Sequence, residues 1–196
     1  MTRELTISTY LDRFEESIST LESNFDDIDG PLGQPTAGRP LELKLTLSGL
    51  RDESAREWTE SETARFEALC SRLDTVVDHL GPAYDDQLLV ELEYLVDTYP
   101  ATINYFLGLD PIDIELWDDL NRRDSLEVLL RELRDRHDLR EQTAAVEALD
   151  TVLKYQYREH LDTLQEYRDI IEKPYFPESF WWRHLDHFET DDENEY

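Results

Sequence analysis

The stretch DLREQTAAVEALDTVLKYQYREHLDTLQEYRDIIEK, residues 138–173, decides the fold, because its helical periodicity is unbroken and it contains neither Gly nor Pro. It predicts one helix of about ten turns, or roughly 50 Å. Apolar side chains recur on one face, as expected of a helix that buries one side in a core. They are Leu139, Val146, Leu149, Leu153, Leu164, Tyr167, Ile170 and Ile171. The rest of the chain is expected to pack around this helix.

Polar side chains interrupt the apolar face in the middle of the predicted helix. Gln142, Gln156, His160 and Thr163 fall within the same arc. Together with Tyr157, the last three are candidates to line a ligand-binding pocket, in which an imidazole that titrates near neutrality serves as acid, base or metal ligand. The alternative is a buried polar layer that fixes the register of the helix.

The composition indicates one acidic domain. A chain of 196 residues is long enough for a single domain with a sizeable core. It has 47 Asp and Glu against 19 Lys and Arg, a net charge of −28, and its only lysines are Lys44, Lys154 and Lys173. This pattern resembles the proteins of salt-in halophiles, since such a charge density repels itself at low ionic strength. A strongly basic partner is the other interpretation.

Several function classes are disfavoured by the sequence. There is no basic run of five or six residues, which argues against nucleic-acid binding. No apolar run approaches the ~20 residues of a membrane span, and the first residues lack a signal-peptide core, so a cytoplasmic location is expected. Cys70 is the only cysteine, which excludes an intramolecular disulfide and a cysteine metal cluster. Its place in an apolar stripe favours a buried, inert thiol.

The first helix is predicted to begin at Thr9, because Asp12 follows it in a capping-box pattern. Apolar residues then alternate spacings of three and four, which is typical of a bundle helix. They are Ile7, Leu11, Phe14, Ile18, Leu21, Phe25 and Ile28.

Residues 30–58 are predicted to be a loop with one strand. Gly30 to Pro40 holds three glycines and three prolines. Leucines then alternate with polar residues over 41–47, a strand pattern; they are Leu41, Leu43, Leu45 and Leu47. A strand needs a partner for its backbone hydrogen bonds. The two alternatives are Arg3 to Ile7 of the same chain and the same strand of a second chain, which would give a homodimer.

Five further helices are predicted from caps and apolar spacing. The first begins at the capping box of Thr59 and Glu62 and stops at Gly81-Pro82. The second spans Tyr84 to Thr98 and is ended by Pro100, and the third spans Ala101 to Leu107. The fourth follows Asp110-Pro111, and the fifth spans Asp124 to about Arg136.

Residues 174–196 form a tail with an aromatic part and an acidic end at 191–196. The aromatic side chains are Tyr175, Phe176, Phe180, Trp181, Trp182 and Phe188. So many exposed aromatics would promote aggregation. They are expected either to fold back on the bundle as a strap or to form a surface that a partner protein covers.

Two Arg and His pairs raise an enzymatic alternative. An Arg followed by a His five to seven positions later is typical of all-helical ribonucleases of the HEPN class, and Arg72 with His79 and Arg131 with His137 have this spacing. Only residues seven apart share a helix face. Arg72, His79 and Arg65, one heptad earlier, are therefore the candidate site for a phosphate-bearing ligand, against the alternative of arginines that flank a core stripe.

Metal and cofactor sites are not predicted. His184 and His187 supply two ligands, whereas structural zinc requires four. A Glu-x-x-His pair, typical of di-iron bundles, does not occur. The sequence also lacks a phosphate-binding Gly loop followed by Lys.

The sequence therefore predicts a mostly α, single-domain bundle of six to eight helices over residues 1–173, with at most a small two-stranded β element and a tail at 174–196. The predicted function is a non-enzymatic interaction or adaptor protein of a halophilic cytoplasm. A protein partner would bind the aromatic segment or the strand at 41–47, and a homodimer is one form of this prediction. The alternative is a helical enzyme or ligand-binding protein that uses the His160 group or the face of Arg72 and His79.

Overall fold

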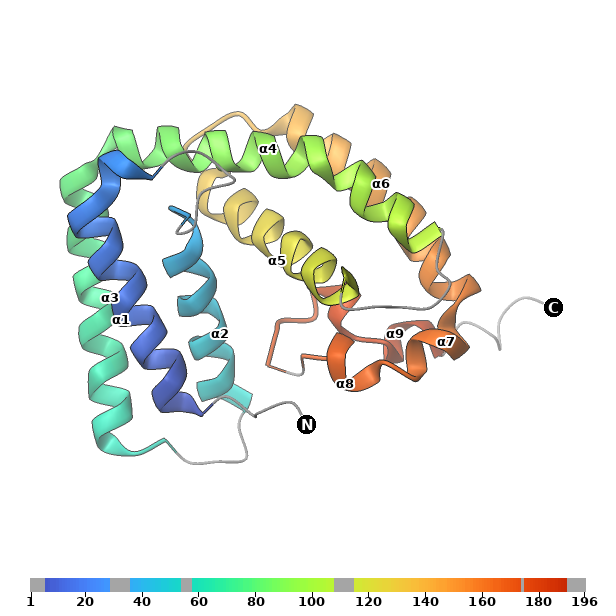
Figure 1. Cartoon of the computed structure of the whole chain (residues 1–196), viewed down its shortest axis with the longest axis horizontal. Coiled ribbons are helices and arrows are strands. Elements are labelled where there is room, and N and C mark those ends of the chain that lie inside the picture. The colour runs from blue at the N-terminus through green and yellow to red at the C-terminus, as the bar shows by residue number, and fades with distance from the viewer. Residues whose placement is uncertain (1–5, 29–35, 54–57, 108–114, 174, 190–196) are drawn as a thin grey trace. The chain divides into compact units, whose positions relative to one another are not determined.

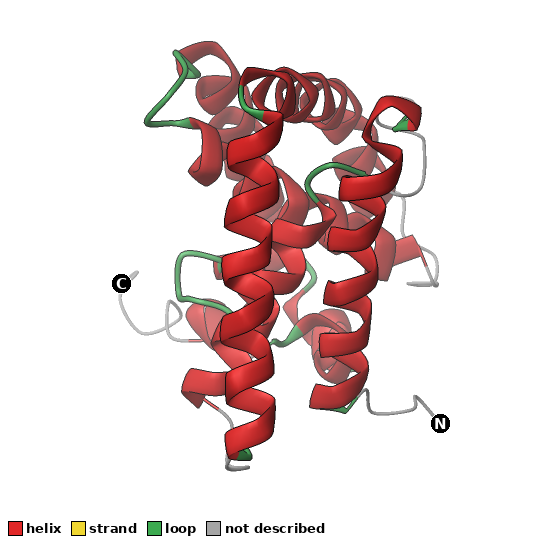
Figure 2. Ribbon diagram, turned by 90° about the vertical axis from the view of Figure 1, so that its left-hand side faces the viewer, coloured by secondary structure: helices red, strands yellow, loops and turns green. Residues whose placement is uncertain are grey.

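The computed structural model describes residues 6–28, 36–53, 58–107, 115–173 and 175–189. Within these ranges the regular elements are nine α-helical segments and two short 3-10 helices (Figure 2). The prediction of a mostly α fold is confirmed. The predicted count of six to eight helices is too low, and the described ranges contain no β element. Arg3, Asp110-Pro111 and the acidic end at 191–196 lie outside the described residues.

The chain divides into two compact units, residues 1–92 and 93–196. Helix α4, Pro82–Leu107, contains the boundary between them. Residues 175–189, the described part of the predicted tail, belong to the second unit.

In the first unit, α1, Ile7–Asn24, packs against α2 and α3 (Figure 1). The apolar seam predicted for this helix is buried over Ile7, Leu11, Phe14, Ile18 and Leu21. The predicted start at Thr9 is wrong by one turn. Thr6 is the N-cap, and its side chain accepts the Thr9 N–H at 3.3 Å. A short 3-10 helix, Phe25–Asp27, follows α1.

The predicted strand at 41–47 is wrong, because this segment lies within helix α2, Arg39–Glu53. A lone strand leaves its backbone groups without partners, whereas a helix satisfies them internally. Leu43 and Leu47, one turn apart, are buried, and the other two leucines of the alternating set are half-buried. Because α2 has two neighbouring helices, α1 and α3, leucines on more than one side of it find cover.

The ends of α3, Glu60–Leu80, confirm the prediction. Thr59 accepts the Glu62 N–H at 3.1 Å, and the Glu62 carboxylate accepts the Thr59 N–H at 2.9 Å, which completes a capping box. Gly81 ends the helix with φ of 56°, a conformation that glycine adopts without steric cost.

Replacing Thr59 by Ala is expected to lower the free energy of unfolding by about 1 kcal/mol, because the Glu62 N–H loses its side-chain acceptor. Urea unfolding at constant molar KCl measures this. Ser61→Ala, at an exposed position of the same first turn, keeps both capping bonds and is the control. An equal loss in both variants would contradict the assigned cap.

Pro100 was predicted to end a helix, but α4 continues through it to Leu107. Proline removes one hydrogen bond and clashes with the carbonyl four residues earlier. The Thr98 hydroxyl donates to the Tyr94 carbonyl at 2.9 Å in the turn before Pro100, and Tyr99 is buried. The burial of Tyr99 favours continuation of the helix despite the proline, whereas the Thr98 bond does not replace the one that Pro100 removes, which would go to the Val96 carbonyl.

In the second unit, one helix, α5, takes the place of two predicted helices, the one that follows Asp110-Pro111 and the one that begins at Asp124. Helix α5 runs without interruption over Glu115–Leu133. Asp124 therefore lies inside a helix rather than at its N-cap, and its buried carboxylate has another use, described below.

The predicted continuous helix over 138–173 is also wrong. It forms α6, Arg140–Glu159, α7, Leu161–Gln165, and α8, Arg168–Ile171. His160 and Tyr167 separate these helices with φ of −117° and −110°. Tyr167 N–H bonds the Leu164 carbonyl at 2.9 Å, an i to i+3 bond that preserves backbone pairing through the bend. Leu164 and Ile171 are 1% and 0% exposed, so the bends still allow both side chains to be buried.

The aromatic segment folds back as a strap within the second unit. It forms the 3-10 helix η2, Trp181–Arg183, and the short helix α9, Asp186–Glu189. Phe176, Phe180 and Trp182 are buried, and the rings of Phe176 and Phe180 stack at 4.8 Å. The segment is therefore part of a core.

Candidate functional site

Arg123 on α5 and Asp150 on α6 form a buried ion pair in the second unit. The guanidinium donates from Nε to Oδ1 at 3.0 Å and from Nη2 to Oδ2 at 2.8 Å. The Tyr99 hydroxyl donates to the same Oδ1 at 2.5 Å. Burial and the neighbouring Asp150 carboxylate raise the pKa of Tyr99 far above its usual value, so the phenol remains a hydrogen-bond donor.

A second buried ion pair joins Asp124 on α5 to Arg183 in η2. Arg183 donates from Nε to Oδ1 at 3.0 Å and from Nη2 to Oδ2 at 2.5 Å. Its Nη2 also donates to the Asn121 side-chain oxygen at 2.9 Å. Arg183 has no exposed surface, so Asp124 compensates a charge that water does not reach.

Trp182 connects the two ion pairs. Its indole N–H donates to Oδ1 of Asp124 at 2.8 Å, and Cζ of Arg123 lies 3.8 Å from the ring centroid. The face of an indole attracts a cation most strongly where water is excluded. We call Arg123, Asp124, Asp150, Trp182 and Arg183 the buried arginine cluster. Its two arginines and two aspartates pair one to one. Because these pairs join α5 to α6 and α5 to η2, they hold the three elements in one arrangement.

A buried carboxylate stands at the N-terminus of α2 in the first unit. Oε2 of Glu91 accepts the Gly38 N–H at 3.0 Å, and the Tyr84 hydroxyl donates to the Ala37 carbonyl at 3.1 Å. Glu91 is 5% exposed. Desolvation raises the pKa of Glu91 to about 7, although the bonds from Gly38 and Thr36 favour the charged form. Glu91 therefore changes charge near neutral pH.

The residues predicted to surround His160 do not form one buried layer. Gln156 and Tyr157 are buried, whereas His160 and Thr163 are exposed. The Tyr157 hydroxyl donates to the Trp182 carbonyl at 2.8 Å, so Tyr157 anchors the aromatic strap. Ligand binding by these residues stays a prediction.

Arg65 and Arg72 share a face of α3, as predicted, and that face meets acids of α1. Arg65 lies 2.6 Å from a carboxylate oxygen of Glu15, and Arg72 donates from Nε to Glu22 at 3.0 Å. His79 is exposed in the last turn of α3. The two arginines thus link α3 to α1, and the phosphate-binding alternative stays a prediction.

His184 and His187 lie side by side, with ring centroids 5.4 Å apart. Among the described residues, no three His, Cys, Asp or Glu side chains converge closely enough to hold a metal ion. Cys70 is half-buried, and desolvation raises the pKa of its thiol.

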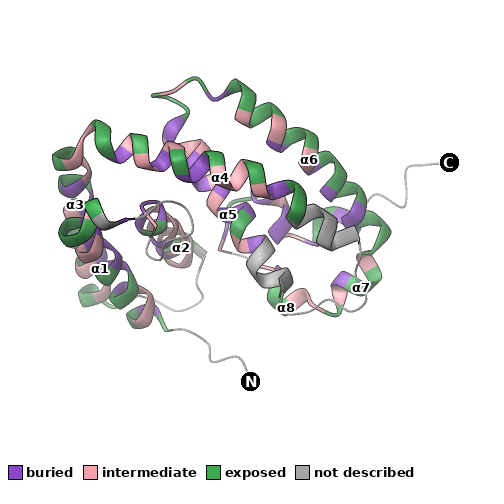
Figure 3. Cartoon of the chain, turned by 45° about the horizontal axis from the view of Figure 1, so that its top comes forward, coloured by how far each residue is buried: buried purple, intermediate pink, exposed green. Residues whose placement is uncertain are grey.

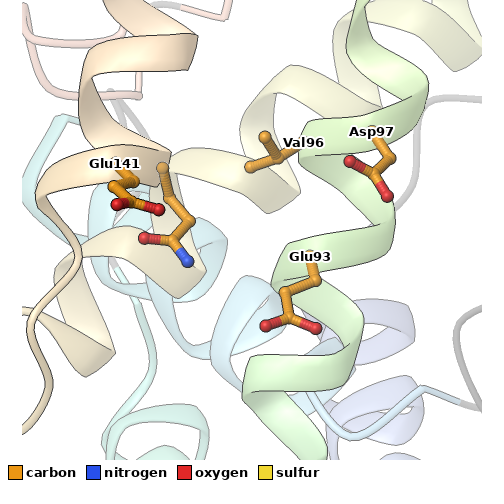
Figure 4. Close-up of a pocket in the computed structure, with 5 residues that line it drawn as sticks. Glu93, Val96, Asp97 and Glu141 are labelled. Atoms are coloured by element: carbon orange, nitrogen blue, oxygen red, sulfur yellow. The ribbon is translucent and has the colours of Figure 1, made fainter.

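Two open pockets border the N-terminal turns of α6. One, of about 260 Å³, is lined by Glu93, Val96 and Asp97 of α4 and Glu141 and Gln142 of α6 (Figure 4). The other, of about 450 Å³, is lined by Asp138, Arg140, Glu141, Gln142 and Ala144. Three of the five side chains of the first pocket are carboxylates, which favours a positively charged group over an apolar one.

Helix α6 has a run of exposed positions opposite its buried side (Figure 3), and four of these residues are small or apolar. Ala144, Ala148, Val152 and Tyr155 are all exposed, with Val152 at 39% and Tyr155 at 57%. Their spacings of four, four and three place them in one stripe along the helix. We call these four residues the α6 outer face.

Sequence reasoning missed the buried arginine cluster. The position of Asp150 indicates a buried charge, because it lies four residues after Val146 and three before Leu153, within the apolar face of α6. The sequence around Arg183 does not predict its ion pair, because its partner Asp124 is 59 positions away.

Comparison of the chain with protein-family models, with curated proteins and with solved structures finds no match. None of the described helices combines the length and the apolar character needed to cross a lipid bilayer. A proposal of function therefore rests on the contacts and exposed surfaces of the chain itself.

Proposed function

We propose that the protein is a non-enzymatic interaction protein of a high-salt cytoplasm, which docks a protein partner on the α6 outer face. The observation that supports this most is the exposure of Val152 and Tyr155 in one stripe of a chain with net charge −28. A helix that faces only water gains nothing from apolar side chains one turn apart, whereas an interhelix contact requires them. Tyrosine is also enriched at protein interfaces.

The two surfaces that the sequence favoured for docking are used within the chain. Leu43 and Leu47 are buried in α2, and Phe180 and Trp182 are buried in the second unit. The proposal therefore moves partner binding to α6. The high-salt cytoplasm remains supported by composition alone, through the excess of carboxylates and the three lysines.

Chemical cross-linking of the tagged chain in native lysate at 2 M KCl tests the proposal. We expect adducts, identified by mass spectrometry, that disappear in Tyr155→Asp and persist in Ile170→Asp. Ile170 is a matched control, because it is 38% exposed in the same unit and lies outside the α6 outer face. Adducts that survive Tyr155→Asp, or the absence of any adduct, would refute docking on this face.

A further inference from the structure

We infer that residues 36–38, which directly precede α2, form a pH-dependent latch: they stay bound to α4 while the Glu91 side chain is neutral and separate from it once that side chain is ionised. We call this contact the α2 latch. It belongs to the first unit, and its behaviour does not depend on docking at the α6 outer face. Three features support it: the burial of Glu91, its hydrogen bonds and the charges around it.

The α2 latch joins two segments that are far apart in the sequence. Glu91 lies 53 positions after Gly38, whose N–H donates to Glu91 Oε2 at 3.0 Å. Tyr84 lies two turns earlier on the same face of α4, and its hydroxyl donates to the Ala37 carbonyl at 3.1 Å. All of Glu91, Tyr84 and Ala37 are buried. Two hydrogen bonds therefore hold the start of α2 against α4 in a place from which water is excluded.

A neutral Glu91 keeps the hydrogen bonds of the charged form. The carboxylate accepts from the Gly38 N–H and from the Thr36 side chain. After protonation, one oxygen still accepts from Gly38, and the new O–H donates to the Thr36 hydroxyl, since a hydroxyl both donates and accepts. Protonation thus removes the charge without breaking the contact.

The surroundings of Glu91 disfavour its charged form. Desolvation raises the pKa of Glu91 to about 7 and outweighs the bonds from Gly38 and Thr36, which lower it. Among the described residues, the charge that acts on this pKa across the contact is the Glu42 carboxylate of α2, which raises it further. Arg39, the cation in the first turn of α2, is bonded to Glu42 at 2.6 Å. The described residues therefore give an ionised Glu91 no compensating cation.

Opening of the α2 latch relieves this cost, because water then reaches the carboxylate and its pKa returns toward the usual 4.5. The closed form thus binds the proton more tightly than the open form. The equilibrium constant for opening is lowest below pH 4.5, rises as the pH approaches 7, and is constant above that. The open form exposes Ala37 and Tyr84, which are both 0% exposed in the closed form.

Amide hydrogen exchange of Gly38, followed by nuclear magnetic resonance at constant 2 M KCl, tests the α2 latch. The protection factor of Gly38 is expected to fall about twentyfold from pH 5.5 to pH 7.5, as pKa values of 4.5 and about 7 for the open and closed forms require. In Glu91→Gln it is expected to stay constant, because the amide is neutral and still offers an acceptor to Gly38 and a donor to Thr36. A wild-type protection factor that does not change with pH would overturn the inference.

Tyr84→Phe is the matched control, because it removes the bond to the Ala37 carbonyl and leaves Glu91 in place. Exchange of Gly38 is expected to be faster in this variant at every pH, with the same dependence on pH as in the wild type. Loss of that dependence in Tyr84→Phe would contradict the role assigned to Glu91.

Urea distinguishes local opening from unfolding of the whole first unit. Exchange through a local opening depends little on low urea concentrations, whereas exchange through global unfolding accelerates with urea in proportion to the surface exposed. We expect low urea to leave exchange of Gly38 unchanged and to accelerate exchange of Leu73, which is 1% exposed in α3. Equal acceleration of both amides would show that Gly38 is released by unfolding alone, and the α2 latch would then be refuted.

Discussion

Replacing Arg183 by Met is expected to lower the free energy of unfolding by about 3–5 kcal/mol, because the buried carboxylate of Asp124 is left without its compensating charge. Arg183 is 0% exposed and Asp124 is 8% exposed, so water does not replace the lost guanidinium. The Trp182 indole N–H, which donates to Asp124 at 2.8 Å, supplies only a partial dipole. Urea unfolding in molar KCl, followed by near-ultraviolet circular dichroism of the tryptophans, measures the change.

A double-mutant cycle separates the ion pair from simple loss of packing. Asp124→Asn in the Arg183→Met background removes the orphaned charge, so the double variant is expected to lose less than the sum of the single losses. Arg140→Met is the control for a surface pair, since Arg140 and its partner Asp138 have side chains that are 89% and 63% exposed. We expect that control to leave the stability nearly unchanged, because water and salt screen an exposed pair. Additive losses in the cycle would contradict coupling within the buried arginine cluster.

Replacing Glu91 by Gln is expected to stabilise the protein above pH 7 and to leave it unchanged below pH 4.5. The folded state raises the pKa of Glu91 from 4.5 to about 7, so it binds this proton more tightly than the unfolded state does. The stability that the protonated group contributes is thus fully present below pH 4.5 and is lost as pH rises toward 7. Because glutamine stays neutral, the advantage of Glu91→Gln reaches about 3 kcal/mol above pH 7.

Urea unfolding at several pH values and constant molar KCl measures this difference between variant and wild type. Glu93→Gln removes one acidic residue at an exposed position of the same helix, so it controls for the smaller net charge. We expect its effect to be small at every pH. A loss of stability in Glu91→Gln at pH 8 would mean that the N-terminus of α2 binds the charged carboxylate.

The sequence predicted the first unit best where local signals and burial agree. The a/d seam of α1 and both ends of α3 follow from side chains a few residues apart, such as Thr59 with Glu62 and Gly81 after Leu80. A cap or a glycine with positive φ acts within one turn of the helix. The end of the helix can therefore be predicted without knowledge of the rest of the fold.

The alternating leucines of α2 show where local reasoning fails. Period-two alternation places apolar side chains around a helix rather than along one face, and it is therefore typical of strands. The neighbours α1 and α3 make such a helix stable, because Leu43 and Leu47 find cover in the first unit. The Glu91 carboxylate, 53 positions from Gly38, adds a hydrogen bond at the start of α2 that no local pattern predicts.

The same limit explains the long helix and the candidate site. Periodicity over 138–173 was read correctly as helical, but the bends at His160 and Tyr167 arise without Gly or Pro. Cluster members such as Asp124 and Arg183 are joined by contacts between distant segments. The predicted site residues were chosen from local spacing. Such spacing shows which side chains share a helix face, but it does not show which segment packs against that face.

The distance in sequence between Asp124 and Arg183 has a consequence for synthesis on the ribosome. Asp124 is made 59 residues before Arg183, or about 3 to 12 s earlier at the usual 5–20 residues per second. During that interval the second unit cannot complete its core, because the cation and the aromatic rings that cover α5 do not yet exist. The first unit is complete earlier in translation, since it ends at Leu92 and its helices α1, α2 and α3 contact one another within the first 80 residues. We therefore expect the first unit to fold while the second is still being translated.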